Sequence, residues 1–123
     1  MTIIEAIEKI DTLKPNTYTK EEKIRWLSTI EGVIVRNVIE GHEGDENISF
    51  DGYDEDTDLD TELIVQEPYD EIYLLWLDAM IDYTNGEFTR YNNTIIRYND
   101  MFTAFSRDFN RTHMPRGKRI RYF

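Results

Sequence analysis

A stretch in the middle of the chain has the spacing of acidic residues that a calcium-binding EF-hand loop requires. In residues 56–67, acids stand at loop positions 1, 3, 5 and 12, and Leu63 stands where such a loop carries its apolar residue. Position 6, which needs glycine for the sharp turn, is Thr61. No helix is predicted to lead into the loop, and Pro68 directly follows it. We therefore expect no specific calcium site here.

The rest of the sequence has no spacing typical of catalysis or of cofactor binding. Cysteine is absent, which excludes disulfides, thiolate nucleophiles and cysteine-ligated metal sites. The two histidines, His42 and His113, stand beside charged residues and are expected at the surface. The six glycines are scattered and form no phosphate-binding loop. We expect neither an enzyme nor a bound cofactor or metal ion, and no apolar run is long enough to span a membrane.

Acidic residues gather in the middle of the chain. The formal net charge is −11, from 25 acidic and 14 basic residues, so the protein as a whole should repel nucleic acid and anionic membranes. Between Arg36 and Arg90 there is no lysine or arginine. Six acids of this stretch are candidates for a functional surface: Asp51, Asp54, Glu55, Asp56, Asp58 and Asp60. The alternative is a solvated loop without a partner.

The C-terminal end reverses the sign of the charge. From Arg111 onward the chain has five basic residues and no acid, and it ends in two aromatic residues. Because arginine and tyrosine are favoured at protein interfaces, we expect this end to dock on another protein. The candidate docking residues are Arg111, Arg116, Lys118, Arg119, Arg121, Tyr122 and Phe123. An acidic middle and a basic end would also let copies of the chain meet head to tail.

Four helices are predicted to position these charges. Capping boxes of the form T-x-x-E begin at Thr2 and Thr19, and another at Thr84 precedes the fourth helix. Proline is favoured in the first turn of a helix, so Pro68 is predicted to begin the third helix. An all-α chain results, with helices at about residues 2–13, 19–40, 68–84 and 87–112.

The segment between the second and third helices, residues 42–67, lacks helical periodicity and is predicted to be a long acidic loop. Residues 47–50 and 62–65 have the composition of two short strands, so a β-hairpin within the loop is one option. Loops of this length in a small domain are usually functional or disordered. Residues 1–115 are predicted to be a single helical domain, followed by a basic tail, residues 116–123.

Apolar residues surround the third predicted helix on nearly every side. A helix of this kind must be covered on more than one face, and one small core rarely covers it fully. We therefore expect a contact with a neighbouring subunit through Tyr69, Tyr73, Leu74, Leu77 and Ile81. The alternative is a central helix that the other three helices surround.

The fourth predicted helix carries a seam of mostly aromatic residues at alternating spacings of three and four. The seam consists of Phe88, Tyr91, Ile95, Tyr98, Phe102, Phe105 and Phe109. A free coiled coil would favour leucine, isoleucine and valine at these positions. The seam is therefore predicted to be core, packed against the third helix as an antiparallel hairpin.

Several short motifs along the chain together form a recognisable pattern. They are residues 67–73 and 76–82, Gly86-Glu87 followed by residues 90–93, residues 110–115, and residues 52–54 with the acidic stretch. The pattern covers roughly residues 50–115 and contains no catalytic motif. It resembles small head–tail connector, or head-completion adaptor, proteins of long-tailed bacteriophages and of prophages of Gram-positive bacteria.

The resemblance implies a largely helical structural protein of the virion, made in the host cytoplasm and assembled as a ring. Such rings contain about twelve subunits beneath the portal, extend the channel for double-stranded DNA, and support a downstream connector or stopper protein. An acidic loop facing the channel would keep DNA from sticking, and a basic tail would dock on the portal. The alternative is a prophage regulatory protein whose acidic loop mimics DNA and binds a basic partner.

Overall fold

The chain folds into four α-helices, as the sequence predicts. A computed structural model describes residues 1–39 and 50–112, and within these residues it contains no strand. The helices are α1 (Ile3–Leu13), α2 (Lys20–Ile34), α3 (Ile72–Thr84) and α4 (Phe88–Thr112). A single turn of π-helix, η1 (Val35–Ile39), continues directly from α2. The all-α prediction is thereby confirmed.

The first two helices begin where the sequence places their caps. The Thr2 side chain accepts a hydrogen bond from the Glu5 N–H at 3.2 Å, and the Glu5 carboxylate accepts one from the Thr2 N–H at 2.9 Å. The Thr19 side chain accepts a hydrogen bond from the Glu22 N–H at 3.2 Å. These bonds satisfy backbone donors that a helix N-terminus otherwise leaves without partners.

The predicted start of the third helix and the predicted cap of the fourth are wrong, although α4 begins within one residue of its predicted start. Pro68 lies in a turn before α3, because the chain first forms short-range bonds such as Tyr69 N–H to Gln66 C=O at 3.0 Å. Thr84 is the last residue of α3, and its hydroxyl donates to the Met80 carbonyl at 2.8 Å. It therefore belongs to the end of one helix and does not cap the next.

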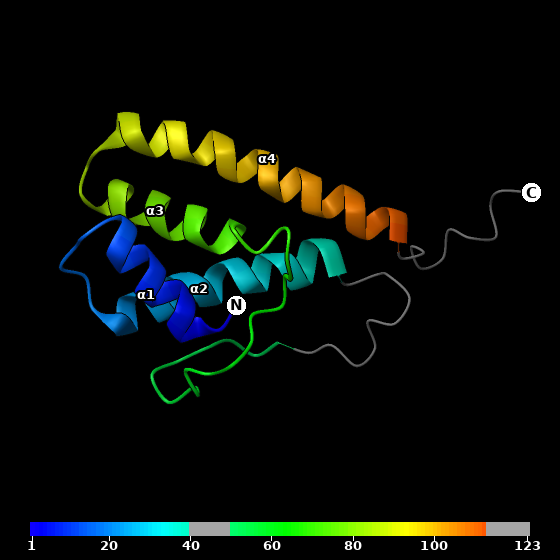
Figure 1. The fold of residues 1–123 in the computed structure, drawn as a ribbon, viewed down its shortest axis with the longest axis horizontal. Coiled ribbons are helices and arrows are strands. Elements are labelled where there is room, and N and C mark those ends of the chain that lie inside the picture. Colours follow the sequence, from blue (N-terminus) through cyan, green and yellow to red (C-terminus); the bar gives the residue numbers. More distant parts are fainter. Residues whose placement is uncertain (40–49, 113–123) are drawn as a thin grey trace, which may run out of the picture.

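Helix α3 lies at the centre of the molecule. Figure 1 shows α4 along one side of it and α1 and α2 along the other. Between α3 and α4 the chain reverses direction over a short turn, in which Gly86 has a φ of +77°. Glycine adopts this left-handed conformation without the steric cost that a Cβ brings.

Three of the five residues expected at a subunit contact are core residues of the single chain. Tyr73 and Leu77 are 0% exposed, and Ile81 is 1% exposed. Tyr69 and Leu74 are half-buried and pack against the same core. The prediction of a subunit interface through Tyr73, Leu77 and Ile81 is corrected, because α1, α2 and α4 together cover α3.

The aromatic seam of α4 is buried in its middle and exposed at its start. Tyr98 and Phe105 are each 8% exposed, and their rings lie 5.2 Å from Trp76 and 6.0 Å from Tyr69 between centroids. Phe88, by contrast, is 56% exposed. The seam is therefore core where α4 faces the centre of α3, and surface near the turn that joins the two helices.

The predicted β-hairpin does not form in the described residues. Residues 62–65 are no strand, and Glu62 forms only an isolated bridge with Thr2. The reason is that the chain here hydrogen-bonds to the start of α1, for example from the Leu63 N–H to the Met1 carbonyl at 3.0 Å. Residues 47–49 of the other predicted strand lie outside the described residues.

Candidate functional site: the acidic segment and its anchor

The six acids that the sequence singles out lie together on an irregular stretch of chain, residues 51–60, which we name the acidic segment. All six side chains are exposed: Asp51, Asp54, Glu55, Asp56, Asp58 and Asp60. Within residues 1–39 and 50–112, none of these carboxylates forms an ion pair. The segment thus presents negative charge that no neighbouring basic side chain of the described chain neutralises.

Two successive turns give the acidic segment its shape. The sequence Asp-X-Asp-Thr occurs twice in succession, starting at Asp54 and at Asp58. In each copy the side chain of the first aspartate accepts a hydrogen bond of 2.9 Å from the backbone N–H of the second. The threonine N–H bonds back to the carbonyl of the first aspartate, at 3.1 and 3.0 Å. This repeat is the signal that would have predicted turns in place of a featureless loop.

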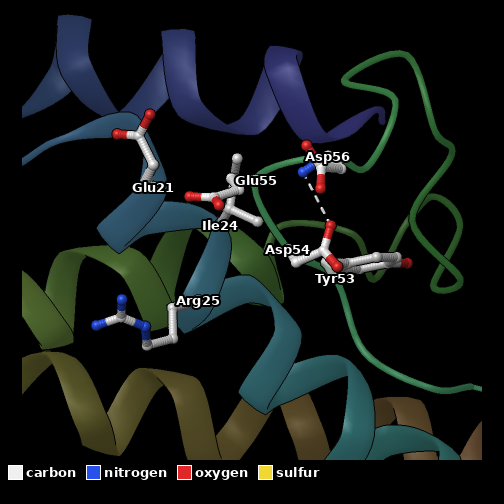
Figure 2. Close-up of a pocket in the computed structure, with 7 residues that line it drawn as sticks. All are labelled: Glu21, Ile24, Arg25, Tyr53, Asp54, Glu55 and Asp56. Carbon is white, nitrogen blue, oxygen red and sulfur yellow. Dashed lines mark hydrogen bonds between the residues drawn. The ribbon is translucent and has the colours of Figure 1, made fainter.

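The first turn closes over the beginning of α2 and leaves a cavity of about 220 Å³. Figure 2 shows the residues that line it: Glu21, Ile24, Arg25, Tyr53, Asp54, Glu55 and Asp56. Arg25 forms an ion pair of 3.0 Å with Glu22, which is not part of the lining. The four carboxylates of the lining make the cavity attractive to positive charge.

The acids of the segment are not arranged as a metal site. Among the residues that the structure describes, no group of three or more histidine, aspartate or glutamate side chains is placed to hold a metal ion. This includes residues 56–67, whose spacing resembles an EF-hand loop. The arrangement can attract a cation or a basic side chain by its charge.

A buried carboxylate that the sequence analysis missed anchors the segment from behind. Glu31 of α2 is 0% exposed and accepts three hydrogen bonds. Its Oε1 accepts from the Tyr73 hydroxyl at 2.5 Å, and its Oε2 accepts from the Tyr53 hydroxyl at 2.8 Å and from the Ile64 N–H at 2.9 Å. The Tyr73 hydroxyl also accepts from the Val65 N–H at 2.8 Å. Glu31 thus ties α2 to α3 and to both sides of the acidic segment.

Burial dominates the protonation of this network. It raises the pKa of Glu31, although the hydrogen bonds from Tyr73, Ile64 and Tyr53 act in the opposite direction. Burial, the nearby charge of Glu31 and its hydrogen bonds raise the pKa of both tyrosines far above neutral pH. Both hydroxyls therefore keep their protons and act as donors to the carboxylate.

Two further contacts fix the acidic segment from opposite directions. The Tyr53 N–H donates to the Ser28 Oγ of α2 at 3.0 Å. At the far end, the Ile4 N–H at the start of α1 donates to the Leu59 carbonyl at 3.0 Å. The chain then enters the core, where Leu63 is 0% exposed. The segment is therefore attached at Tyr53 on one side and from Leu59 onward on the other.

Ion pairs fasten α1 to its neighbours. At the end of α1, the Lys14 Nζ lies 2.8 Å from the Asp82 Oδ1 and 3.1 Å from the Asp78 Oδ1. Asp82 is 1% exposed. Burial alone would lower the pKa of Lys14, but the hydrogen bonds to Asp82 and Asp78 raise it. Lys23, which is 3% exposed, lies 2.6 Å from Asp11. These contacts hold α1 against α3 and α2 respectively.

Only one of the predicted docking residues falls within the described residues. Arg111 is exposed at the end of α4 and forms an ion pair of 2.5 Å with Asp108. The other six lie outside the described residues: Arg116, Lys118, Arg119, Arg121, Tyr122 and Phe123. Docking by this end of the chain stays a prediction.

Comparisons of the chain with protein-family models, with curated proteins and with solved structures found no match. In the part of the chain that the structure describes, no helix is long and apolar enough to cross a membrane. A function must therefore be argued from the side chains and from the resemblance given above.

Proposed function

We propose that the chain is a structural subunit of a head–tail connector in a long-tailed bacteriophage or prophage. In this role, copies of the chain close into a ring of about twelve subunits, dock on the portal and extend the DNA channel. A downstream connector or stopper protein binds the other side of the ring. The subunit is made in the host cytoplasm, ends in the virion at the head–tail junction, and catalyses no reaction.

The observation that carries the proposal is the acidic segment. Its six carboxylates are exposed, and within residues 1–39 and 50–112 they form no ion pair. A channel wall with this charge repels the phosphate backbone, so double-stranded DNA passes without sticking. The two turns and the Glu31 anchor suit this role, because they keep the carboxylates at the surface of the subunit.

The all-helical fold and the basic C-terminal end also support the proposal. The resemblance implies a largely helical subunit, and the chain has four helices and no strand in its described residues. The acidic segment and the end of α4 lie at well-separated places in the molecule (Figure 1). One surface can therefore face the channel while the basic end, from Arg111 onward, docks on the portal.

The test is assembly with the portal protein encoded by the same phage or prophage genome. We expect the chain to co-sediment with portal oligomers and to form a ring on them in electron micrographs. A double variant, Asp56→Asn with Asp60→Asn, should still form the ring. More double-stranded DNA should remain bound to this ring than to the ring of the natural chain. The matched control, Glu8→Gln with Asp100→Asn, removes two exposed acids elsewhere and should leave DNA retention unchanged.

The rival function is a prophage regulatory protein that mimics DNA. The same exposed carboxylates favour it, because acids held at fixed positions can imitate phosphates. Failure to bind the cognate portal would refute the connector proposal. Capture of a basic DNA-binding protein, with release when DNA is added, would favour the mimic.

A further inference from the structure

We infer that Tyr53 is a latch, and that its release swings residues 53–58 away from α2 and opens the acidic cavity. We name residues 53–58 the acidic turn. The inference goes beyond the proposed function and does not depend on it, because it concerns only contacts within one chain.

Tyr53 holds the start of the acidic turn through its hydroxyl and its backbone N–H. Its hydroxyl donates to the Oε2 of Glu31 at 2.8 Å, and its N–H donates to the Ser28 Oγ at 3.0 Å. Residues 54–57 form their other hydrogen bonds with one another, such as that of 2.9 Å from the Asp56 N–H to Asp54, whereas Asp58 accepts from the N–H groups of Asp60 and Thr61. The turn can therefore move as a unit once the two hydrogen bonds of Tyr53 break.

Gly52 provides a pivot on one side of the turn. Its φ is +102°, a backbone conformation that residues with a side chain rarely adopt. A Cβ at this position would also lie 3.4 Å from the Ser28 Oγ, which is the acceptor of the Tyr53 N–H. The closed position of the turn thus depends on a glycine immediately before the latch.

On the other side, the chain stays in place when the turn moves. Leu59 is hydrogen-bonded through its carbonyl to the Ile4 N–H at 3.0 Å, and Thr61 in the same way to the Ile3 N–H at 3.0 Å. Leu63 and Val65 are 0% and 1% exposed in the core. Opening is therefore confined to residues 53–58 and, apart from the Tyr53 ring, which packs against the core, leaves the core packed.

The charge of the acidic turn favours opening. Asp54, Glu55 and Asp56 follow one another and line the same cavity as Glu21 of α2, which is also acidic, and Figure 2 shows Glu55 between Glu21 and the two aspartates. Like charges within a Debye length of about 8 Å repel one another at physiological ionic strength. The bonds of Tyr53 oppose this repulsion, so the latch and the charge act against each other.

The absence of cysteine allows a direct measurement of opening. Ile24 lines the cavity beneath the turn and is 3% exposed, so a thiol in an Ile24→Cys variant can react with a maleimide only when the turn opens. We expect Tyr53→Phe to raise the labelling rate of this thiol at least about tenfold, because it removes a hydrogen bond to a carboxylate. Gly52→Ala should raise it as well, by straining the closed position.

Two controls separate opening from a general loss of stability. Ala79→Cys places a thiol in the core of α3, where Ala79 is 0% exposed, and in the Tyr53→Phe background it should label far more slowly than Ile24→Cys. Tyr98→Phe removes a hydroxyl that has no hydrogen bond to another described residue and should leave Ile24→Cys labelling unchanged. An unchanged rate at Ile24→Cys in the Tyr53→Phe background would overturn the inference. Equal labelling rates at the two thiols would do the same, because both thiols would then react only through global unfolding.

Discussion

Removal of one buried hydroxyl group, in Tyr73→Phe, should destabilise the folded chain strongly. Tyr73 is 0% exposed, and its hydroxyl has two partners. It donates to the Oε1 of Glu31 at 2.5 Å and accepts from the Val65 N–H at 2.8 Å. Phenylalanine keeps the ring and its packing, so the change isolates these two hydrogen bonds.

The expected magnitude follows from the two groups that lose their partner. Leaving a buried donor or acceptor unsatisfied costs about 1–3 kcal/mol, and more where the group is charged. The Val65 N–H, in a residue that is 1% exposed, and the Glu31 carboxylate, in one that is 0% exposed, both lose a partner. We therefore expect the free energy of unfolding to fall by about 2–5 kcal/mol in Tyr73→Phe, a large share of the stability of a small domain.

Urea unfolding followed by far-ultraviolet circular dichroism measures this change. Tyr98→Phe is the matched control, because it removes a hydroxyl without a hydrogen bond to another described residue and should change stability by less than about 0.5 kcal/mol. The double variant of Tyr73→Phe and Glu31→Gln should cost less than the sum of the single variants, since the two residues share one bond. A loss below about 1 kcal/mol in Tyr73→Phe would refute the assigned role of the network.

Three further predictions concern protonation, packing and the C-terminal end. Because burial raises the pKa of Glu31 above its ordinary 4.5, the folded state holds this proton more tightly than the unfolded state. The stability of the natural chain relative to Glu31→Gln should therefore fall as the pH rises from 4.5 through the raised pKa, as measured by urea unfolding at each pH. Phe105→Ala should lower the free energy of unfolding by about 3–5 kcal/mol, whereas Phe88→Ala, at an exposed position, should lower it by less than about 1 kcal/mol. Truncation after Pro115 should leave the melting temperature nearly unchanged and abolish co-sedimentation with the cognate portal.

Those parts of the fold that depend on neighbours in the sequence could be predicted. The capping residues Thr2 and Thr19 lie within three positions of their partners, and both helices begin there. The start of α3 could not be found in this way. Pro68 suits a first helical turn, but the chain uses residues 66–70 for a separate turn before the helix begins. The preference of proline for a first helical turn does not show at which residue the helix begins.

Hydrophobic pattern alone could not say what covers α3. Apolar residues on every side of a helix predict that it is covered on several sides, but the pattern is the same whether the cover comes from one chain or from two. Helix α4, at 25 residues, is long enough to pack on α3 and to reach beyond it. Together with α1 and α2 it buries Tyr73, Leu77 and Ile81 within the single chain.

The charged surface could be predicted, but its anchor could not. Asp54 and Asp58 stand in an acidic stretch without lysine or arginine, and the structure exposes them. Glu31 is separated from its partners Tyr53, Ile64 and Tyr73 by 22, 33 and 42 residues along the chain. The sequence did contain one sign of it, because an acid four residues after Leu27 falls within the apolar stripe of α2 and needs buried partners.

The negative field of the acidic segment arises from how charges are paired as well as from composition. Basic side chains of the described residues form ion pairs with acids elsewhere: Lys14, Lys23, Arg25, Arg90 and Arg111. Two of these pairs hold α1 against α3 and α2, so their lysines cannot turn toward the segment without loosening the helices. Within the described residues, the acids of residues 51–60 consequently lie exposed and form no ion pair. This arrangement would suit the proposed channel wall, because repulsion of DNA there depends on carboxylates that no side chain of residues 1–39 and 50–112 neutralises.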